Sequence, residues 1–167
     1  MKSRDSRRLS LPESIPNLDR RRMTVVAAVI ERTGQILIGQ RSLGDWNQLK
    51  WEFPGGKMEP AESPREALQR ELREELDIAA EIGEELTRYE YEYPGKPPIQ
   101  LIFFRVAQFA GEPKNLAFHQ IRWESAARFP DYEFLDGDID FVQRLARGEW
   151  PAVATALQQR PAVAPSA

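Results

Sequence analysis

Cysteine is absent from the 167-residue chain, and histidine occurs once, at His119. The lack of cysteine excludes a disulfide framework, a thiolate nucleophile and a cysteine-ligated zinc, and a single histidine excludes a metal site built from several histidines. Apolar runs are also short. None approaches the roughly 18 residues that a membrane-spanning helix needs, and the basic N-terminal stretch lacks the apolar core of a secretory signal. We therefore expect a cytoplasmic protein that does not contact a membrane.

The two ends of the chain differ in composition from its middle. Residues 1–22 carry more Lys/Arg than Asp/Glu, and residues 149–167 are rich in alanine and proline. We predict a basic, flexible arm over 1–22, one domain over 23–148 and a loose tail over 149–167. The arm has two interpretations, contact with nucleic acid or a solvated terminus, and the absence of aromatic residues among its charges favours the second.

Hydrophobic patterning predicts strands, turns and two helices along the domain. Apolar runs flank the turns at 31–35 and 94–95, as in two hairpins, whereas the segment 41–57 has no period and contains glycine and proline. The predicted elements are a hairpin (23–39), a loop (41–57), a helix beginning after Ser63, a second hairpin (86–109), a short strand (121–123) and a helix (137–148). Hairpins with two separate helices indicate an α/β fold in which helices cover a mixed β-sheet.

The first of these helices has a clear start. Ser63 is a good N-cap, a proline occupies the first helical position, and Glu66 completes a capping box. A leucine every fourth residue from Leu68 gives an apolar stripe that should face the core.

Glu71, Glu74 and Glu75 share one sector of this helix beside the leucine stripe. Like charges at this spacing repel one another, whereas carboxylates that converge at the edge of a core suit a hard divalent cation that shares its ligands with phosphates. The alternative is a solvated helix face in which neighbouring arginines pair with the glutamates. The glycine turn before the helix and Lys57 favour the cation, because such a turn lets backbone groups approach a metal or a phosphate.

The spacing of these residues resembles the sequence box of the Nudix hydrolases. In that box a glycine is followed, at fixed distances, by a glutamate, an Arg-Glu pair, an aliphatic residue, a Glu-Glu pair, a glycine and a second aliphatic residue. The matching positions here are Gly56, Glu62, Arg70, Glu71, Leu72, Glu74, Glu75 and Ile78. Asp77 is the one departure, because it stands where the family has glycine.

Segments outside the box are similar to the MutT-type branch of this family, which hydrolyses nucleoside triphosphates, including oxidised ones, to monophosphate and pyrophosphate. The similar segments are "LKWEFPGGK", "YEYP" and "FAGEP", and the likeness covers roughly residues 23–147. It implies a Nudix-type α/β/α sandwich with a mixed β-sheet between helices. It also implies a pyrophosphohydrolase of acid anhydrides, with either the sanitising of damaged nucleotides or housekeeping of the nucleotide pool as its role.

The resemblance implies that the box binds Mg²⁺ or Mn²⁺. In the family the residues at Glu74 and Glu75 are metal ligands, and the carbonyl group at Gly55 is commonly a further one. Glu71 is a ligand or a base that helps to activate water, and Arg70 orients a glutamate from outside the coordination sphere. The implied catalytic residues are thus Arg70, Glu71, Glu74 and Glu75, and the implied metal ligands are Gly55, Glu71, Glu74 and Glu75.

Phosphate contacts are implied for three basic residues. Arg41 and Lys57 are similar to residues that contact phosphates in the MutT-type branch, and Lys96, just past the second hairpin turn, is a further candidate. For Arg41 the alternative is an ordinary charge at a strand end.

Base recognition is implied for Asp138, which stands where the branch has a residue that reads the edge of the base. The alternative is that Asp136 or Asp138 caps the last helix. A carboxylate accepts hydrogen bonds and a protonated carboxyl group also donates one, so cytidine and oxidised guanine nucleotides both remain open. Phe53 and three other aromatic residues are candidates to stack on a base or, alternatively, core residues. The other three are Trp46, Trp51 and Tyr93.

Two positions depart from the family pattern. Asp77 replaces the glycine that ends the helix, and since aspartate visits the left-handed conformation more readily than most residues, we expect some lost stability and an intact metal site. MutT-type enzymes often carry a further metal-binding glutamate where this chain has Ala117. Either water completes the coordination there, or Glu112 or His119 substitutes.

We therefore expect a divalent-metal-dependent enzyme that hydrolyses nucleoside triphosphates as small-molecule substrates and acts as a monomer or homodimer. One alternative is another substrate in which a nucleoside diphosphate is linked to a further group. A second is a nucleotide- or RNA-binding module with reduced catalysis. The intact glutamates of the box argue against this second alternative, whereas Ala117 and the basic arm argue for it.

Overall fold

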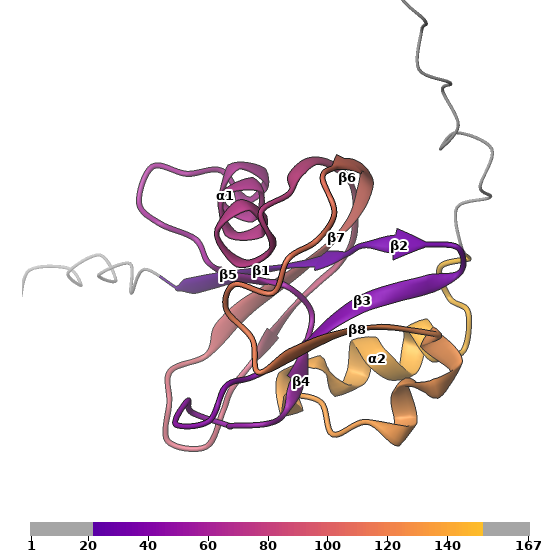
Figure 1. Cartoon of the computed structure of the whole chain (residues 1–167). Coiled ribbons are helices and arrows are strands. Elements are labelled where there is room, and N and C mark those ends of the chain that lie inside the picture. The colour runs from indigo at the N-terminus through magenta and orange to yellow at the C-terminus, as the bar shows by residue number, and fades with distance from the viewer. Residues whose placement is uncertain (1–21, 152–167) are drawn as a thin grey trace, which may run out of the picture.

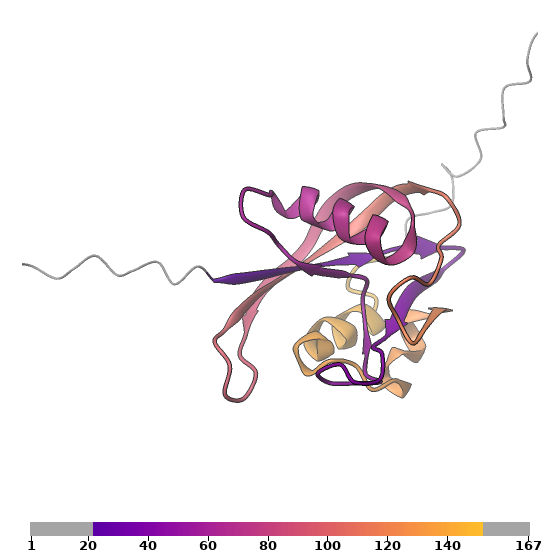
Figure 2. The same cartoon turned by 60° about the vertical axis from the view of Figure 1, so that its left-hand side comes forward.

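In the computed structural model, which describes residues 22–151, two four-stranded sheets lie between two α-helices. The elements in chain order are β1 (Met23–Val29), β2 (Glu31–Arg32), β3 (Gln35–Gln40), β4 (Trp51–Glu52), β5 (Gly55–Lys57), α1 (Pro64–Leu76), β6 (Ala79–Tyr91), β7 (Ile99–Ala110), β8 (Gln120–Glu124), the 3₁₀ turns η1 (Ala126–Asp131) and η2 (Asp136–Asp138), and α2 (Ile139–Ala146). Figures 1 and 2 show α1 on one side of the strands and α2 on the other. The predicted α/β fold with helices on both faces is confirmed. No helix in the described range is long and apolar enough to cross a membrane.

The larger sheet is mixed, with strand order β5-β1-β7-β6. Its two central strands, β1 and β7, run parallel, and the outer pairs are antiparallel. The second sheet contains β2, β3 and β4, with β8 paired to the other edge of β3. The second hairpin, the short strand near 121–123 and the last helix are confirmed, although β6 begins before the predicted start of its hairpin.

The first predicted hairpin was wrong in its pairing. Its turn joins β2 to β3, whereas β1 pairs with β5 and β7 in the other sheet. The reason is burial: β1 is a nearly continuous buried run, which suits a central strand with neighbours on both edges rather than one arm of a hairpin.

The predicted loop over 41–57 was wrong in part, because it contains β4 and β5. Both strands are very short, and β5 contains two glycines, so neither shows the hydrophobic alternation that predicts a strand. Of the predicted arm, the structure describes Arg22 alone, which pairs with Glu90. The rest of the arm and most of the tail lie outside the described residues.

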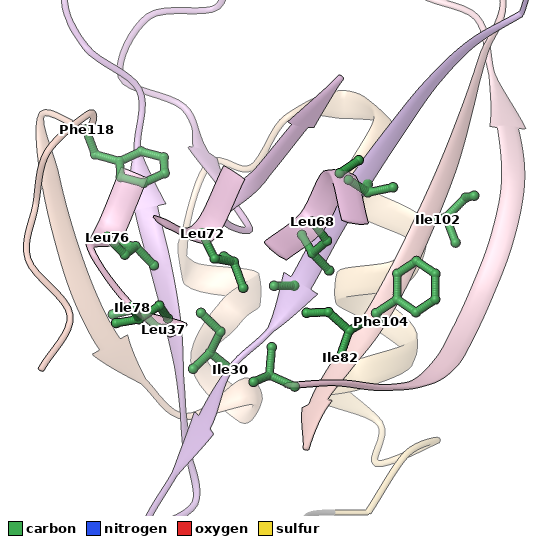
Figure 3. Packing of buried hydrophobic residues seen from close by; sticks show 14 residues of the cluster. Ile30, Leu37, Leu68, Leu72, Leu76, Ile78, Ile82, Ile102, Phe104 and Phe118 are labelled. Atoms are coloured by element: carbon green, nitrogen blue, oxygen red, sulfur yellow. The ribbon is translucent and has the colours of Figure 1, made fainter. Parts of the chain in front are cut away.

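The leucine stripe of α1 packs on the mixed sheet as predicted. Leu68, Leu72 and Leu76 are fully buried against β1 and β7 side chains such as Ile102 (Figure 3). Each buried leucine contributes about 2 kcal/mol of hydrophobic free energy. The packing fixes the rotation of α1, so that its glutamate sector faces the turn that precedes it.

Both ends of α1 have the predicted conformation. Glu66 donates its N–H to Ser63 Oγ at 3.3 Å, and Ser63 donates its N–H to Glu66 Oε2 at 2.8 Å, which completes the capping box. Asp77 ends the helix in the left-handed region with φ 55°, and its N–H bonds to the carbonyl groups of the last turn. Lys114 contacts the Asp77 carboxylate at 2.6 Å.

Candidate active site

A cleft of about 930 Å³ opens beside β1, between the glycine turn before α1 and the start of α2. Its wall comes from β1, from the segment 52–57, from the tip of the β6–β7 hairpin and from the segment before α2. The predicted site residues that line it are Arg41, Phe53, Gly55, Lys57, Glu75, Lys96 and Asp138. Arg70, Glu71 and Glu74 are outside this lining, although they project from the same helix as Glu75.

Two glycines let the turn approach its neighbours closely. At Gly55, where φ is +150°, a Cβ atom would lie 2.0 Å from the carbonyl oxygen of Val26, so β5 can pair with β1 only without a side chain there. At Gly56 a Cβ atom would lie 2.5 Å from the carboxyl group of Glu71. Because neither glycine has a side chain, this turn packs directly against the Val26 backbone and the Glu71 carboxyl group. We call the turn at Gly55 and Gly56, with the glutamates that contact it, the cradle.

The Glu75 side chain reaches the same turn. Gly55 donates its N–H to Glu75 Oε2 at 3.0 Å. Burial is the largest cause of a Glu75 pKa raised to about 8; the hydrogen bond from Gly55 opposes the shift, and the nearby carboxyl groups of Glu52 and Glu71 add to it. Negative charge at this end of the cleft is thus unfavourable without an accompanying positive charge.

Arg70 ties the acidic residues of this region together. Its Nε and Nη2 donate to the two carboxylate oxygens of Glu62 at 2.7 and 3.0 Å, and Nη1 donates to Glu71 Oε1 at 2.9 Å. Nη2 also donates to the carbonyl oxygen of Lys57 at 3.0 Å, and Nη1 lies 3.4 Å from Glu74 Oε2. The pKa of Arg70 is raised, and its hydrogen bonds to Glu62 are the largest cause. The guanidinium therefore fixes the orientation of Glu71 relative to the turn.

The residue types at this end fit a hard divalent cation. Carboxylates at Glu71, Glu74 and Glu75 and the carbonyl group of Gly55 are all oxygen donors, and Glu71 and Glu75 both lie against the glycine turn. Within residues 22–151 the acidic side chains do not converge into a group of three around one point. Arg70 holds Glu71 and the glycine turn holds Glu75, so each faces its own partner.

The three predicted phosphate-binding residues have different surroundings. Arg41 donates Nη1 to both oxygens of Glu52 at 3.0 and 3.1 Å and Nε to the carbonyl oxygen of Trp46 at 2.8 Å. Lys96 places Nζ 3.7 Å from the centre of the Trp46 ring. Lys57 is exposed and, among the described residues, forms no ion pair. Lys57 is thus the cation most available to an anionic ligand.

Glu52 is a cleft residue that the sequence analysis missed. It lies between the buried aromatic residues Trp51 and Phe53, and only its pairing with Arg41 compensates its charge. Burial is the largest cause of a raised pKa at Glu52, and the Arg41 charge opposes it. An acidic residue between two aromatic residues in "KWEFPGGK" was the available signal, because alternation places it on the opposite face from the core.

Asp138 lies at the other end of the cleft and is 5% exposed. Its carboxyl group accepts a hydrogen bond from the backbone N–H of Phe53, and burial, reinforced by Glu52, raises its pKa well above the ordinary value. Asp138 is the N-cap residue of α2 by position, but its side chain makes no capping hydrogen bond. Asp136 pairs with Lys50 at 2.6 Å instead. Helix capping therefore does not account for the burial of the Asp138 carboxyl group.

The aromatic candidates separate into core and cleft residues. Phe53 is 3% exposed and packs on Phe103, Phe134 and Phe141, so most of its ring belongs to the core even though it also lines the cleft. Trp51 is buried as well. Trp46 is 45% exposed at the cleft mouth. The Trp46 ring is the aromatic face that a ligand can reach most easily.

The position with the unexpected alanine is away from the cleft lining. Ala117 is exposed, and its carbonyl oxygen accepts a hydrogen bond from Ser42 Oγ at 3.2 Å. Neither of the suggested substitutes lines the cleft: Glu112 pairs with Arg32 at 2.8 Å, and His119 is exposed on the strand edge next to Gln40. The structure therefore gives no support to a replacement ligand from either residue.

Comparison with known proteins gives consistent relatives. The family model described as NUDIX domain matches residues 20–145. The chain is 40% identical to the CTP pyrophosphohydrolase of Escherichia coli (strain K12) over 71% of this chain and 87% of that protein. It is also 40% identical to an 8-oxo-dGTP diphosphatase of Haemophilus influenzae, over 77% of this chain and 94% of the relative.

Solved structures agree with the sequence relatives. The solution structure of the Escherichia coli ORF135 protein matches with a TM-score of 0.68 and 39% identity, covering 78% of this chain and 94% of the other. The crystal structure of a MutT protein from Methanosarcina mazei Go1 matches with the same TM-score and 28% identity, covering 80% and 99%. With the glycine cradle, the glutamate helix and these relatives in agreement, the chain belongs to the Nudix family and is a pyrophosphohydrolase of its MutT-type branch.

Proposed function

We propose that the protein hydrolyses nucleoside triphosphates to nucleoside monophosphate and pyrophosphate with the help of bound Mg²⁺ or Mn²⁺. The observation that carries the proposal is the single cleft that joins the Gly55–Glu75 cradle at one end to Asp138 at the other. A polar group for a base at one end and basic and acidic groups for phosphates at the other match the two parts of a nucleotide. The names of the two 40% identical relatives, which refer to CTP and 8-oxo-dGTP, support the same substrate class.

The divalent cation would be held by Glu71, Glu74, Glu75 and the carbonyl oxygen of Gly55. When bound, it would neutralise triphosphate charge and lower the pKa of a water molecule. Arg70 keeps Glu71 oriented through its hydrogen bonds to Glu62 and Glu71, so the ligand does not have to be ordered when substrate arrives.

Phosphate binding is assigned to the basic residues of the lining. Lys57 extends from the turn at the cradle, where it can pair with the phosphate chain. Arg41 has Nε and Nη1 committed to Trp46 and Glu52, which leaves Nη2 as the donor for a phosphate oxygen. Lys96 lies over Trp46 at the cleft mouth, where its charge attracts an anionic nucleotide.

We further propose that Asp138 reads the base and favours cytidine nucleotides. A carboxyl group buried as deeply as Asp138 holds its proton, so it offers one O–H donor and one carbonyl acceptor side by side. Cytosine and adenine both present the complementary pair, an amino donor next to a ring-nitrogen acceptor, and the name of the 40% identical CTP pyrophosphohydrolase favours cytosine of the two. Guanine presents two adjacent donors on its pairing edge, which suit an ionised carboxylate instead.

A panel of nucleoside triphosphates with added Mg²⁺ or Mn²⁺ tests the proposal, with released pyrophosphate and orthophosphate measured separately. We expect pyrophosphate as the inorganic product, dependence on the cation, and the highest kcat/KM for CTP or dCTP. Orthophosphate as the main product contradicts the cleavage position. Undiminished turnover after chelation contradicts the cation, and the highest kcat/KM for 8-oxo-dGTP contradicts the base assignment alone.

A further inference from the structure

The backbone next to Asp138 is held by two tyrosine side chains of β6 and the turn after it. Tyr89 Oη donates to the carbonyl oxygen of Gly137 at 2.7 Å. Gly137 donates its N–H to Tyr93 Oη at 3.2 Å. Both polar backbone groups of Gly137 are thus bonded to side chains from a segment more than 40 residues earlier in the chain. This arrangement takes no part in the regular hydrogen bonding of α2.

The tyrosines can approach Gly137 closely because it has no side chain. A Cβ atom at Gly137 would lie 2.7 Å from Tyr93 Oη, 3.2 Å from Leu101 Cδ1 and 3.3 Å from Tyr91 Cδ1. Gly137 has no positive φ, so glycine is required here for space and not for backbone conformation. The close approach of the tyrosine to the backbone of Gly137 is therefore a built feature of the segment that carries Asp138.

Tyr93 also contacts the other side of the cleft. Its ring meets the Trp46 ring edge-on at a centroid distance of 4.7 Å, and its carbonyl oxygen accepts the N–H of Lys96 at 3.0 Å. Lys96 in turn lies over the Trp46 ring. Tyr93, Trp46, Lys96 and Asp138 all line the cleft. Tyr93 consequently joins the mouth of the cleft to the segment that places Asp138.

We propose that Tyr89 and Tyr93 are positioning residues for base selection, which act by holding the Gly137 backbone so that the Asp138 carboxyl group keeps one orientation in the cleft. This inference rests on the proposed function, because it takes Asp138 as the residue that reads the base. The carbonyl group bonded by Tyr89 belongs to the peptide that links Gly137 to Asp138, so its orientation is transmitted directly to the aspartate. Tyr93 holds the preceding peptide, between Asp136 and Gly137, through the Gly137 N–H. Loss of either bond would free one of the two peptides that flank Gly137, so that the Asp138 carboxyl group would no longer present its donor and acceptor in fixed positions.

The experiment compares Tyr93→Phe with the unaltered protein. The variant keeps the ring and its contact with Trp46 and removes only the hydroxyl group. We expect kcat/KM for the preferred nucleotide to fall about fivefold relative to that for the other bases, since one hydrogen bond corresponds to about 1 kcal/mol. The effect should appear in KM, with kcat for the preferred nucleotide changed less than about twofold, because the cradle at the other end is untouched.

Tyr91→Phe is the matched control. Tyr91 is the last residue of β6, and its ring packs on the Tyr93 ring at a centroid distance of 4.7 Å, but its hydroxyl group makes no hydrogen bond to a described residue. We expect this variant to keep the base preference of the unaltered protein. Tyr89→Phe should reproduce the effect of Tyr93→Phe, and it serves as the second variant if Tyr93→Phe fails to fold.

An Asp138→Ala background separates positioning from general weakening. If Tyr93 acts through Asp138, then Tyr93→Phe has no further effect on base preference once Asp138 is removed. An equal fall in both backgrounds, or an unchanged preference in the single variants Tyr93→Phe and Tyr89→Phe, overturns the inference. If the unaltered protein releases no pyrophosphate from any nucleotide, the proposed function itself fails, and that outcome is seen before any variant is compared.

Discussion

The two ends of the cleft are built in different ways. The end assigned to the cation comes from one contiguous stretch, the turn at Gly55–Lys57 and the helix that follows it. The end assigned to the base is assembled from parts far apart in the chain, with Phe53, Tyr93 and Asp138 brought together by the packing of both sheets and α2. The cation end thus depends on spacing within one local stretch, whereas the base end depends on how separate segments pack together.

The contrast extends to how each end tolerates charge. At the cradle, Arg70 binds Glu62, Glu71 and Glu74, so the acidic residues there are partly compensated from within the same region. At the base end, Asp138 is almost fully buried and its neighbours Glu52 and Arg41 are already paired with each other. Burial raises the pKa of Glu75 at the cradle and of Asp138 at the base end, so the two ends differ in the pairing that Arg70 gives to the acidic residues around the cradle.

Glu74→Gln should have the largest effect, because it removes a proposed cation ligand. We expect kcat to fall by a factor of about 1,000 or more, by analogy with the loss of other transition-state charge stabilisers. The Glu74 side chain is 59% exposed, so the melting temperature should stay within about 2 °C of the unaltered protein.

Glu66→Gln is the control on the same helix, because glutamine preserves the capping box and Glu66 has no place in the cleft. It should leave kcat unchanged. If the Glu74 variant still releases pyrophosphate as fast as the unaltered protein, the cradle is not the place where the triphosphate is cleaved.

Asp138→Asn tests the protonated form proposed for the other end, and it should raise stability while largely keeping base preference. Burial raises the Asp138 pKa, so the folded protein holds a proton there that the unfolded chain releases. The stability contribution of this group is therefore present below the unfolded pKa of about 3.9 and is lost as pH rises toward the folded value. Asparagine does not titrate and still accepts the hydrogen bond from Phe53.

We expect the free energy of unfolding at pH 8 to rise by about 1 kcal/mol in Asp138→Asn, with a smaller difference near pH 4. Base preference should be largely kept, because the amide presents an N–H donor beside a carbonyl acceptor, the same pair as the protonated carboxyl group. Denaturant unfolding at the two pH values and the nucleotide panel provide the measurements. A variant less stable at pH 8 than at pH 4, relative to the unaltered protein, would show that Asp138 is ionised in the fold.

The same contrast explains what the sequence could predict. The cradle end depends on spacing along one helix, and the capping box and the leucine stripe were predicted correctly from local patterns. The left-handed conformation of Asp77 was predicted from the family glycine whose place it takes. The base end depends on contacts between residues far apart in sequence. Nothing near Tyr93 in the chain indicates that its hydroxyl group bonds Gly137, and nothing near Arg41 indicates its pairing with Glu52. Strand pairing failed for the same reason at β1, whose partners are β5 and β7 and not the next strand along the chain.

Asp77→Gly should have the smallest effect and acts on neither end of the cleft. Asp77 holds φ 55° at the end of α1, a conformation that glycine adopts without the steric cost that other residues carry. The substitution also removes the contact with Lys114, but both side chains are more than half exposed, and an exposed ion pair contributes little. We therefore expect a net gain of about 0.5 kcal/mol in the free energy of unfolding, measured by denaturant titration, with kcat and base preference unchanged. A loss of stability would mean that the pairing with Lys114 outweighs the backbone strain at the helix end. A change in kcat would mean that the end of α1 controls the position of Glu74 and Glu75, so that the cradle is less self-contained than its contacts indicate.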